Sequence, residues 1–336
     1  MKVFISKTDI TPLLTRCTWS GSRLQVARRL EFEFVQDDRD PNIPVVEFEN
    51  GYTVRGFNDN AKSFDDTDNM EFIGNIYRIE RSRKNGSVSI IALDHLHVLG
   101  VSKTTRKFSG AKPEDIAGQI CQELGVKAGT FAKTDTPVSF IANAKTGYQI
   151  IQSAYFEASK KTKKKYQPIM NGDKLDVIEK GELIKDKETG ENYTADSTVN
   201  MTESVYKESI EKLINQILVV DDKGNTVSIQ KDEDSIKKYS MFQDVYKTDP
   251  NKDTQTEIKD ILEKNKIDRG GYITVLGDYR VKSSYSIIVK DSLFKGQFWI
   301  KSDTHTFIDG KHEMKLELEF ENIMNEEKAE KEKEQK

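Results

Sequence analysis

Four side chains that could bind a metal ion or transfer protons lie near the C-terminal end of the sequence. Asp303, His305, Asp309 and His312 fall within ten residues and include two of the chain's four histidines. Carboxylate and imidazole groups are zinc ligands and also serve as general acids and bases. A metal site, however, needs three or four ligands with supporting hydrogen bonds.

The segment around these residues has the pattern of an antiparallel hairpin. After His312, the apolar residues Met314, Leu316, Leu318 and Phe320 alternate with charged ones, and Asp309-Gly310 suits the turn. Asp303, His305 and His312 could therefore approach one another across the hairpin. Since histidine and threonine are readily accommodated on a sheet surface, the pattern favours a structural role. We predict no catalytic, cofactor-binding or metal-binding residue.

Other charged clusters are interpreted in the same way. His95 and His97 have i, i+2 spacing without a nearby cysteine or third histidine. The acidic runs at 37–40 and 58–69 lack the central glycine and distant glutamate of a calcium loop. Residues 160–165 contain five lysines and follow a predicted helix, where cations complement the helix dipole. A solvated face is favoured there, and contact with an acidic partner surface is the alternative.

The sequence contains no recognisable nucleophile motif, such as Gly-x-Ser-x-Gly, and no phosphate-binding glycine-rich loop. Cys17 and Cys121 fall in different predicted units, which argues against a disulfide and is consistent with a reducing compartment. A Cys–His hydrolase stays open as an alternative, because a catalytic triad forms in space and not in sequence.

Composition limits the classes of protein to consider. The chain has 336 residues, of which 36% are hydrophobic and 32% charged, with a net charge of −4. This length allows two or three domains with separate cores. The charge argues against a nucleic-acid binder that relies on bulk attraction. No apolar run approaches the roughly 18 residues of a membrane span, and the first residues lack the pattern of a signal peptide.

The elements that must position these residues are mainly strands. Residues 28–36 alternate in polarity, and Asn50-Gly51 and Asn85-Gly86 predict the turns of two hairpins, over 45–57 and 72–94. Residues 40–44 predict a turn.

The second hundred residues change in character. They predict a helix from Pro113 to a stop at Gly125, a second helix over 147–161 and a hairpin over 166–181. Residues 183–215 receive no assignment.

Strands and one amphipathic helix are predicted for the remainder. A hairpin is expected over 216–230, a short helix and an extended run over 232–246, and the amphipathic helix over 253–267. Strands return over 272–322, and the charged tail 325–336 is expected to be a solvated helix extension or disordered.

A short repeat indicates an internal duplication. Phe72-x-Gly74 and Phe294-x-Gly296 are each followed by one residue, an apolar residue and an aromatic residue, and both enter a strand. The predicted fold is therefore α+β and mainly β, with two tube-like antiparallel β-barrel or sandwich domains joined by an α/β insert. The expected domains are 1–105 (β-domain I), 106–192 (α+β insert), 193–268 (a mixed segment that partly completes domain II), 269–324 (β-domain II) and 325–336 (charged tail).

Four stretches carry a likeness to a known family: residues 72–103, 232–246, 277–291 and 296–320. The Asp-Ser-Ile-x-x-Tyr element and the final Thr-His-x-Phe-x-x-Gly-x-His-x-Met strand pair are the most specific. On these motifs the chain resembles the XkdQ/YqbQ-type proteins of defective Bacillus prophages. These are baseplate hub proteins of contractile phage tails and are similar to the central hub of long-tailed myophages.

The resemblance implies a non-enzymatic structural protein in the tail of a phage virion or of a phage-tail-like bacteriocin, assembled in the bacterial cytoplasm. It implies a homotrimer that joins the hexameric tail tube to a trimeric spike, with wedge and tape-measure proteins as further partners. No membrane or sequence-specific nucleic acid is expected as a partner. A tail-associated peptidoglycan hydrolase using Asp303, His305 and His312 is the alternative from another class, and a sugar-binding module is a third.

Overall fold

The computed structural model describes residues 1–36, 45–83, 86–186, 189–249 and 253–324. The chain divides into two compact units, which are described separately. Unit 1 comprises residues 1–204 and the chain from 272 onward, and unit 2 comprises residues 205–271. The predicted turn at 40–44, the acidic run 37–40, Asn85 and the tail 325–336 lie outside the described residues.

The first β-module forms from alternating apolar residues in the N-terminal part of unit 1. Leu30, Phe32 and Phe34 on β4 are fully buried, as the alternation predicts. The strands of this module are β1 (Lys2–Ile5), β2 (Thr8–Asp9), β3 (Leu14–Ser22), β4 (Arg29–Val35), β5 (Thr53–Phe57), β6 (Met70–Arg81) and β7 (Ser87–Asp94). Two 3-10 turns, η1 (Thr11–Leu13) and η2 (Thr67–Asn69), connect them. The predicted hairpin over 45–57 contains only β5, because 45–49 is not a strand.

The second β-module is built from the C-terminal part of the chain. Its buried residues Met314, Leu316 and Leu318 lie on β21, in the alternation seen in the sequence. Its strands are β13 (Thr194–Asp196), β14 (Met201–Ser209), β18 (Asp268–Leu276), β19 (Ser286–Lys290), β20 (Lys295–Ile308) and β21 (Lys311–Glu319). The strands expected over 272–322 are confirmed. β13 and β14 lie in the stretch that received no assignment.

The two modules have the same strand order. The first is ordered β3-β4-β7-β6-β5-β1, with the two-residue β2 added beyond β1, and the second is ordered β14-β18-β21-β20-β19-β13. Apart from β2, strands with the same rank along the chain occupy the same place. One difference is that β5 pairs with β1 antiparallel, whereas β19 pairs with β13 parallel. The predicted duplication is therefore confirmed at the level of strand order. The two Phe-x-Gly motifs fall at the start of the equivalent strands β6 and β20, but two residues out of register, since the bulges make Arg78 equivalent to Ser302.

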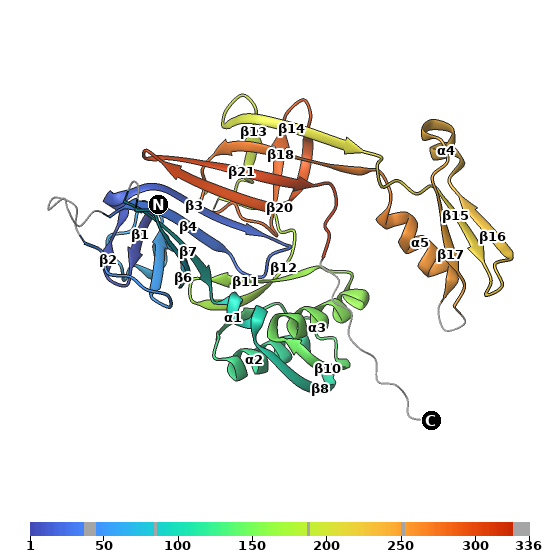
Figure 1. Cartoon of the computed structure of the whole chain (residues 1–336), viewed down its shortest axis with the longest axis horizontal. Helices are drawn as coiled ribbons and strands as arrows, with labels where there is room; N and C mark the ends of the chain where they lie inside the picture. Colours follow the sequence, from blue (N-terminus) through green and yellow to red (C-terminus); the bar gives the residue numbers. More distant parts are fainter. Residues whose placement is uncertain (37–44, 84–85, 187–188, 250–252, 325–336) are drawn as a thin grey trace. The chain divides into compact units, whose positions relative to one another are not determined.

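The modules merge into one sheet through β20, as the red and blue strands in Figure 1 show. Lys295–Trp299 of β20 pair with β19 of the second module, and Ser302–Phe307 pair with β3 of the first. The other edge of β20 pairs with β21. Within the described residues this sheet has 13 strands, and it covers two apolar cores, one in each module. The fold is α+β and mainly β.

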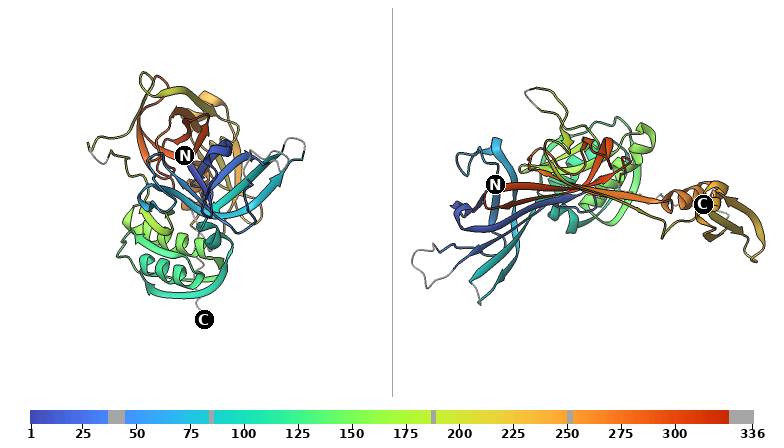
Figure 2. Two further views of the ribbon diagram at one scale, coloured as in Figure 1. Left: turned by 90° about the vertical axis from the view of Figure 1, so that its left-hand side faces the viewer. Right: turned by 90° about the horizontal axis from the view of Figure 1, so that it is seen from above.

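The insert between the modules is an α+β region with its own core, in which Tyr155 and Tyr166 pack at 5.0 Å between ring centroids. Figure 2 shows its helices in two further views. Pro113 begins one helix, Gly125 ends it in the left-handed conformation, and Thr146 and Gln149 form a capping box on the other. The elements are α1 (Leu96–Val101), β8 (Lys103–Ala111), α2 (Pro113–Leu124), β9 (Lys127–Phe131), β10 (Val138–Thr146), α3 (Gly147–Thr162), β11 (Tyr166–Asn171) and β12 (Lys174–Glu179).

Unit 2 is a small sheet covered by one helix. Ile217 and Val219 of the central strand are buried with Ile258 of the helix, which has the predicted amphipathic pattern. Its elements are β15 (Gln216–Val220), β16 (Thr226–Lys231), α4 (Glu233–Tyr239), β17 (Gln243–Lys247) and α5 (Thr254–Lys264). The expected hairpin, short helix with extended run, and amphipathic helix are all confirmed.

Glycine occupies the two motif positions, 74 and 296, for different physical reasons. Gly296 has φ +121°, a conformation that favours glycine, and a Cβ there would meet no atom within 4 Å. A Cβ at Gly74 would instead collide with the backbone carbonyl oxygen of Leu93 on β7. Gly74 is therefore required by close packing of two strands.

We expect Gly74→Ala to lower the free energy of unfolding by about 1–3 kcal/mol, because the strands must separate locally to admit a methyl group. Denaturant titration of the purified protein measures this. Gly270→Ala on β18 is the control, since a Cβ there meets no atom within 4 Å. An equal change in both variants would contradict the explanation.

Candidate functional site at the junction of the two modules

The structure brings Asp303, His305 and His312 together where β20 meets β3. In the β20–β3 register Asp303 lies opposite Gly21 and His305 opposite Trp19, while His312 lies opposite Phe307 on the β21 side. The side chains of Asp303 and His305 are fully buried. Asp309 does not join them, because it lies in the β20–β21 turn with φ 51° and is exposed.

Asp303 forms a bidentate ion pair with Arg28, the residue just before β4. Arg28 Nη1 lies 3.0 Å from Asp303 Oδ1, and Nη2 contacts Oδ2. The backbone N–H of Ser283 also donates to Oδ1, at 2.6 Å. Gly21 leaves the space that the Arg28 side chain occupies, since a Cβ there would overlap the guanidinium. The ion pair therefore joins the first module to the second.

Arg28 also ties the junction to the start of the insert. Its backbone N–H donates to Asp94 Oδ2 at 3.0 Å, and Asp94 Oδ1 accepts from the backbone N–H of Leu96 at 3.0 Å. Burial raises the pKa of Asp94 to about 7, although these two hydrogen bonds oppose the shift. The guanidinium also lies 4.2 Å from the ring centre of Trp19, in cation–π geometry.

The two histidines form a hydrogen-bonded pair. His305 Nδ1 lies 2.9 Å from His312 Nε2, and His305 Nε2 lies 2.9 Å from the carbonyl oxygen of Val281. A carbonyl only accepts, so we assign the proton of His305 to Nε2; in a neutral His305, Nδ1 then accepts from His312. The His312 ring packs 4.2 Å from Phe307 and 4.7 Å from Tyr279 between centroids.

The surroundings lower the pKa of both Asp303 and His312, with opposite consequences for their charge at neutral pH. Burial opposes ionisation of Asp303, but the charge of Arg28 and hydrogen bonds from His305 and Arg28 outweigh it and hold the pKa of Asp303 well below its usual range. Burial, together with the charge of His305, lowers the pKa of His312 to about 4. At neutral pH the site therefore contains a charged Arg28–Asp303 pair beside a neutral His312.

The arrangement uses its polar atoms internally. Both ring nitrogens of His305 and both carboxylate oxygens of Asp303 have partners in the network. Among the residues that the structure describes, no group of three or more His, Cys, Asp and Glu side chains could hold a metal ion. The chemistry available to the network is hydrogen bonding and charge pairing that set the position of β20 against β3.

A second buried ion pair links the insert to both modules. Arg23, after β3, contacts Glu319 on β21 with 2.6 Å between Nε and Oε1. Lys180, after β12, lies 3.6 Å from the same carboxylate and donates to the carbonyl oxygen of Ile323 at 2.6 Å. Burial lowers the pKa of Lys180 to about 8, although Glu319 opposes this shift.

The remaining candidate residues lie elsewhere. His95 precedes the first residue of α1, without a side-chain capping hydrogen bond, and His97 lies within α1, so the two do not share the face of a strand. The His97 ring packs 4.4 Å from that of Tyr77. Asp66 accepts hydrogen bonds from the backbone of Lys62 and the side chain of Asn69. It thus stabilises its own loop.

The lysine run 160–165 and the cysteines are also separate from the junction. Lys160 pairs with Glu157 and Lys164 with Glu179 on exposed surface. Cys17 and Cys121 are free thiols buried in different cores. Burial raises the pKa of Cys17 to about 12 and that of Cys121 to about 11, which suppresses the reactive thiolate.

Sequence reasoning missed Arg28, and a signal for it was present. Arg28 has the same parity as Leu30, Phe32 and Phe34, so it continues the buried face of β4. A charge on a buried face indicates a charged partner. The sequence contained no comparable signal for Trp19 and Ser283. Trp19 lies near Asp303 only because β20 pairs with β3, and Ser283 only because the chain before β19 returns over these strands.

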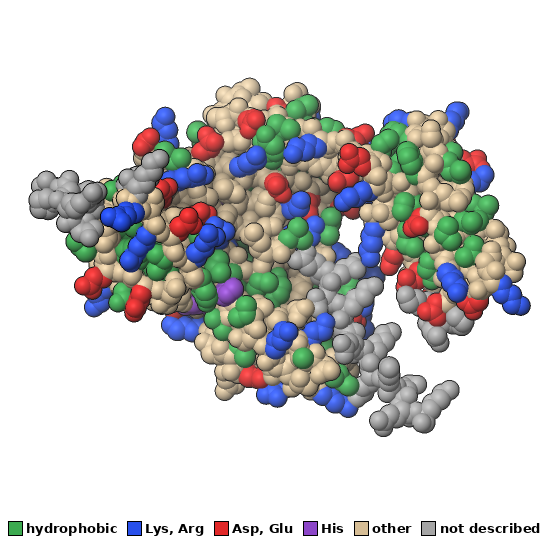
Figure 3. Space-filling model, in the orientation of Figure 1, with side chains coloured by type: hydrophobic (Ala, Val, Ile, Leu, Met, Phe, Trp, Pro, Cys, Tyr) green, Lys and Arg blue, Asp and Glu red, His purple; other side chains and the backbone are tan. Residues whose placement is uncertain are grey.

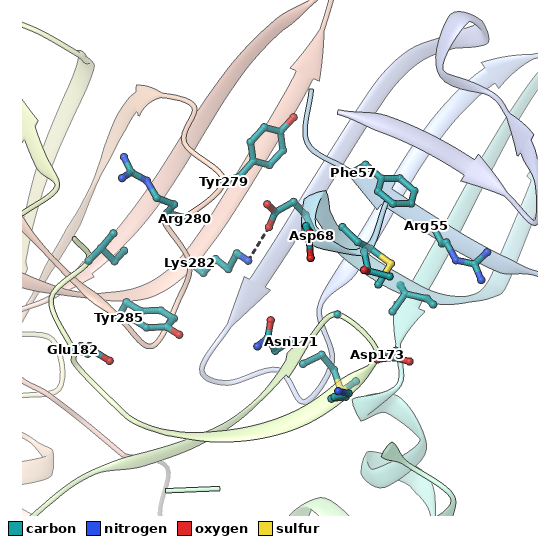
Figure 4. Close-up of a pocket in the computed structure, with 18 of the residues that line it drawn as sticks. Arg55, Phe57, Asp68, Asn171, Asp173, Glu182, Tyr279, Arg280, Lys282 and Tyr285 are labelled. Carbon is teal, nitrogen blue, oxygen red and sulfur yellow. Dashed lines mark hydrogen bonds and ion pairs between the residues drawn. The ribbon is translucent and has the colours of Figure 1, made fainter. Parts of the chain in front are cut away.

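A cavity of about 790 Å³ opens beside the junction in unit 1 (Figure 4). Segments 55–73, 170–174, 182–185 and 279–285 contribute its lining, in which Lys282 pairs with Glu71 at 3.0 Å. Its lining residues include charges of both signs and no histidine or cysteine among those described. Charges of both signs are likewise interspersed over the face of unit 1 in Figure 3. Neither the cavity lining nor this surface therefore favours a ligand of one particular charge.

Comparison with known proteins identifies the family. The family model described as YQBQ-like matches residues 17–319, which include the whole junction, the second β-module and the first β-module from within β3 onward. The chain belongs to this family. No curated protein matches it.

No described helix is long and apolar enough to cross a membrane.

Solved structures share the fold at low identity. The 43 kDa tail protein of prophage MuSo2 from Shewanella oneidensis has 10% identity and a TM-score of 0.66, with 95% of this chain and 97% of that chain covered. A tail protein from Neisseria meningitidis has 13% identity and a TM-score of 0.60, with 94% and 95% covered. A type VI secretion protein of Escherichia coli, described as similar to bacteriophage T4 tail proteins, has 9% identity and a TM-score of 0.53, with 98% and 78% covered.

We expect Asp303→Asn to lower the free energy of unfolding by about 3–5 kcal/mol, because the guanidinium of Arg28 is left buried without a counter-charge. Glu31→Gln is the matched control, since it breaks the half-exposed Arg29–Glu31 pair and should cost less than about 1 kcal/mol. Denaturant unfolding at pH 7.5 measures both. Equal losses would contradict a structural role of the ion pair at the junction.

The His312 pKa predicts a pH dependence. A folded-state pKa near 4, below the unfolded value, means that this group's stabilisation is complete above about pH 6.5 and is lost as pH falls toward 4. His312→Gln keeps a donor toward His305 but does not titrate. We expect the variant to lose less stability than the parent between pH 7.5 and pH 5.0 in parallel denaturant titrations. Identical losses would show that His312 protonates without cost.

Proposed function

We propose that this protein is a structural hub of a contractile tail baseplate, in a phage or a phage-tail-like particle assembled in the bacterial cytoplasm. The observation that carries the proposal is the repeated module, in which six strands recur in the same order within one chain. Family membership and the fold shared with phage tail proteins support it.

The repeat provides a way to match two symmetries. A trimer of chains with two similar modules each presents six similar surfaces, which suits a hexameric tail tube on one side and a trimeric spike on the other. We assign domain I to residues 1–105, the insert to 106–192, and domain II to 269–324, partly completed by 193–268. The tube, spike, wedge and tape-measure proteins are the proposed partners.

The alternative functions receive less support from the described side chains. In a peptidoglycan hydrolase, Asp303, His305 and His312 would need access to substrate, whereas Asp303 and His305 are fully buried and hydrogen-bonded within the junction. A sugar-binding module would need exposed tryptophan faces. Trp19 is fully buried, and Trp299 is only partly accessible. The proposed role is therefore structural and not enzymatic.

We expect native mass spectrometry to find three copies of the chain per particle, either in the purified protein alone or in its complex with the neighbouring tail proteins. A protein that is monomeric under both conditions would refute the hub. Zymography on peptidoglycan, with His305→Ala as control, tests the alternative: clearing by the parent that the variant loses would favour the hydrolase.

A further inference from the structure

We infer that β6 and β14 form the contact between copies of this chain, as an antiparallel strand pair that repeats the β20–β3 pairing inside the chain. The inference rests on the proposed assembly of several copies and names the edges that would meet. It follows from a mismatch between equivalent strands, because β20 has a partner along its second half and β6 does not.

The equivalence can be traced strand by strand. β20 corresponds to β6, and β3 corresponds to β14. The first half of each long strand pairs with the strand before it in the chain, β19 for β20 and β5 for β6. The second half of β20 then pairs with β3. Among the described residues, no strand occupies the same place beside the second half of β6, and none lies on the side of β14 away from β18.

Backbone directions suit the proposed pairing. Ser82 donates its backbone N–H to Ser87 on the β7 side, so the backbone groups of Arg81 and Arg83 point to the other edge. Just before β14, the carbonyl of Asn200 accepts from the backbone N–H of Leu276 of β18, which directs the backbone groups of Glu203 and Val205 away from β18. Within the described part of the chain, each copy thus has one β6 edge and one β14 edge without a neighbouring strand.

The register follows from two bulges. β6 shifts against β7 before Arg78, and β20 shifts against β21 before Ser302, so Arg78 and Ser302 are equivalent. Counting across the successive paired strands then makes Thr18 of β3 equivalent to Ser204 of β14.

The internal pairs are then transferred to the contact between copies. His305↔Trp19 becomes Arg81↔Val205, and Phe307↔Cys17 becomes Arg83↔Glu203. In this register, the backbone groups of Arg81 and Arg83 face those of Val205 and Glu203, as the backbone directions above require.

Charge supports a second copy as the occupant. Residues 78–83, the end of β6 and the two residues after it, read Arg-Ile-Glu-Arg-Ser-Arg, with three positive charges and one negative. In the transferred register Arg78 lies opposite Glu208 and Arg83 opposite Glu203, and opposite charges directly across a strand pair stabilise it. Arg78, Glu203 and Glu208 are all exposed in the single chain. Arg78 pairs there with Glu80, and Glu208 with Arg269, so the contact between copies would extend or replace these exposed pairs.

The geometry makes the contact head-to-tail. The β6 edge of one copy binds the β14 edge of the next, and such a contact generates a ring when the rotation closes. A closed ring of modules also removes both unpaired edges, which would otherwise pair nonspecifically.

A designed disulfide tests both the contact and its register. Glu80 and Tyr206 correspond to the internal pair Thr304↔Ser20 and would lie opposite each other with side chains on one face. We expect Glu80→Cys/Tyr206→Cys protein, oxidised with oxidised glutathione, to convert from single chains to covalent oligomers on non-reducing gels. The native thiols Cys17 and Cys121 are buried.

The matched control moves one cysteine by one residue. Glu80→Cys/Lys207→Cys places the two thiols on opposite faces of the sheet, so it should remain monomeric on the same gel. Equal cross-linking of both variants would overturn the register. Absence of cross-linking in a protein whose native mass is that of a trimer would overturn this contact and leave the hub proposal standing. A parent protein that is monomeric alone and with its neighbouring tail proteins would overturn both.

Discussion

The antiparallel pairing of β20 with β3 is the contact on which the architecture of unit 1 depends. It converts two separate modules into one continuous sheet, and it does so with a strand that already belongs to the second module. A strand that serves two partners along one edge must hold a fixed register, because a shift by one residue would turn every side chain to the other face. The side chains buried on this strand supply that register.

Those side chains are polar, which is unusual for a surface buried between two cores. Burial removes the hydration of an Arg–Asp pair such as Arg28 and Asp303, which costs free energy. The attraction between the two charges offsets much of this cost only when all of their hydrogen bonds are formed. The backbone of Ser283 and the stacking of Arg28 on Trp19 complete the set. An apolar junction would slide more easily, so the ion pair and the histidine pair select one register at some cost in stability.

The duplication has a physical consequence beyond economy of sequence. Two modules with one strand order place similar edges at regular positions, so the contact that joins the modules within a chain is also available between chains. The insert interrupts the chain between the modules and is fastened through Lys180 and Asp94 to the strands on either side of the junction. Repetition therefore supplies the two edges on which the proposed ring depends, and the insert has no repeated counterpart in the chain.

The sequence by itself determined most of the elements. Alternation in 28–36 and 312–318, the ends of α2 and the amphipathic α5 were legible, since each depends on neighbours within a few residues. Phe320, expected on the buried face with Leu318, is exposed beyond the end of β21. The family followed from short motifs, and the repeat at Gly74 and Gly296 located equivalent strands. The buried parity of Arg28 was also legible, although its partner was not.

Tertiary structure alone decided how those elements meet. That Asp303 finds Arg28, 275 positions away, depends on β20 crossing from one module to the other. The clustering of His305 with His312 was foreseeable from their hairpin, but its burial was not, because burial depends on chain that returns from residues 279–285 to cover the strands. The physical reason is range: periodicity and capping act over one or two turns of backbone, whereas the partner of a buried charge is chosen by the pairing of strands that are distant in sequence.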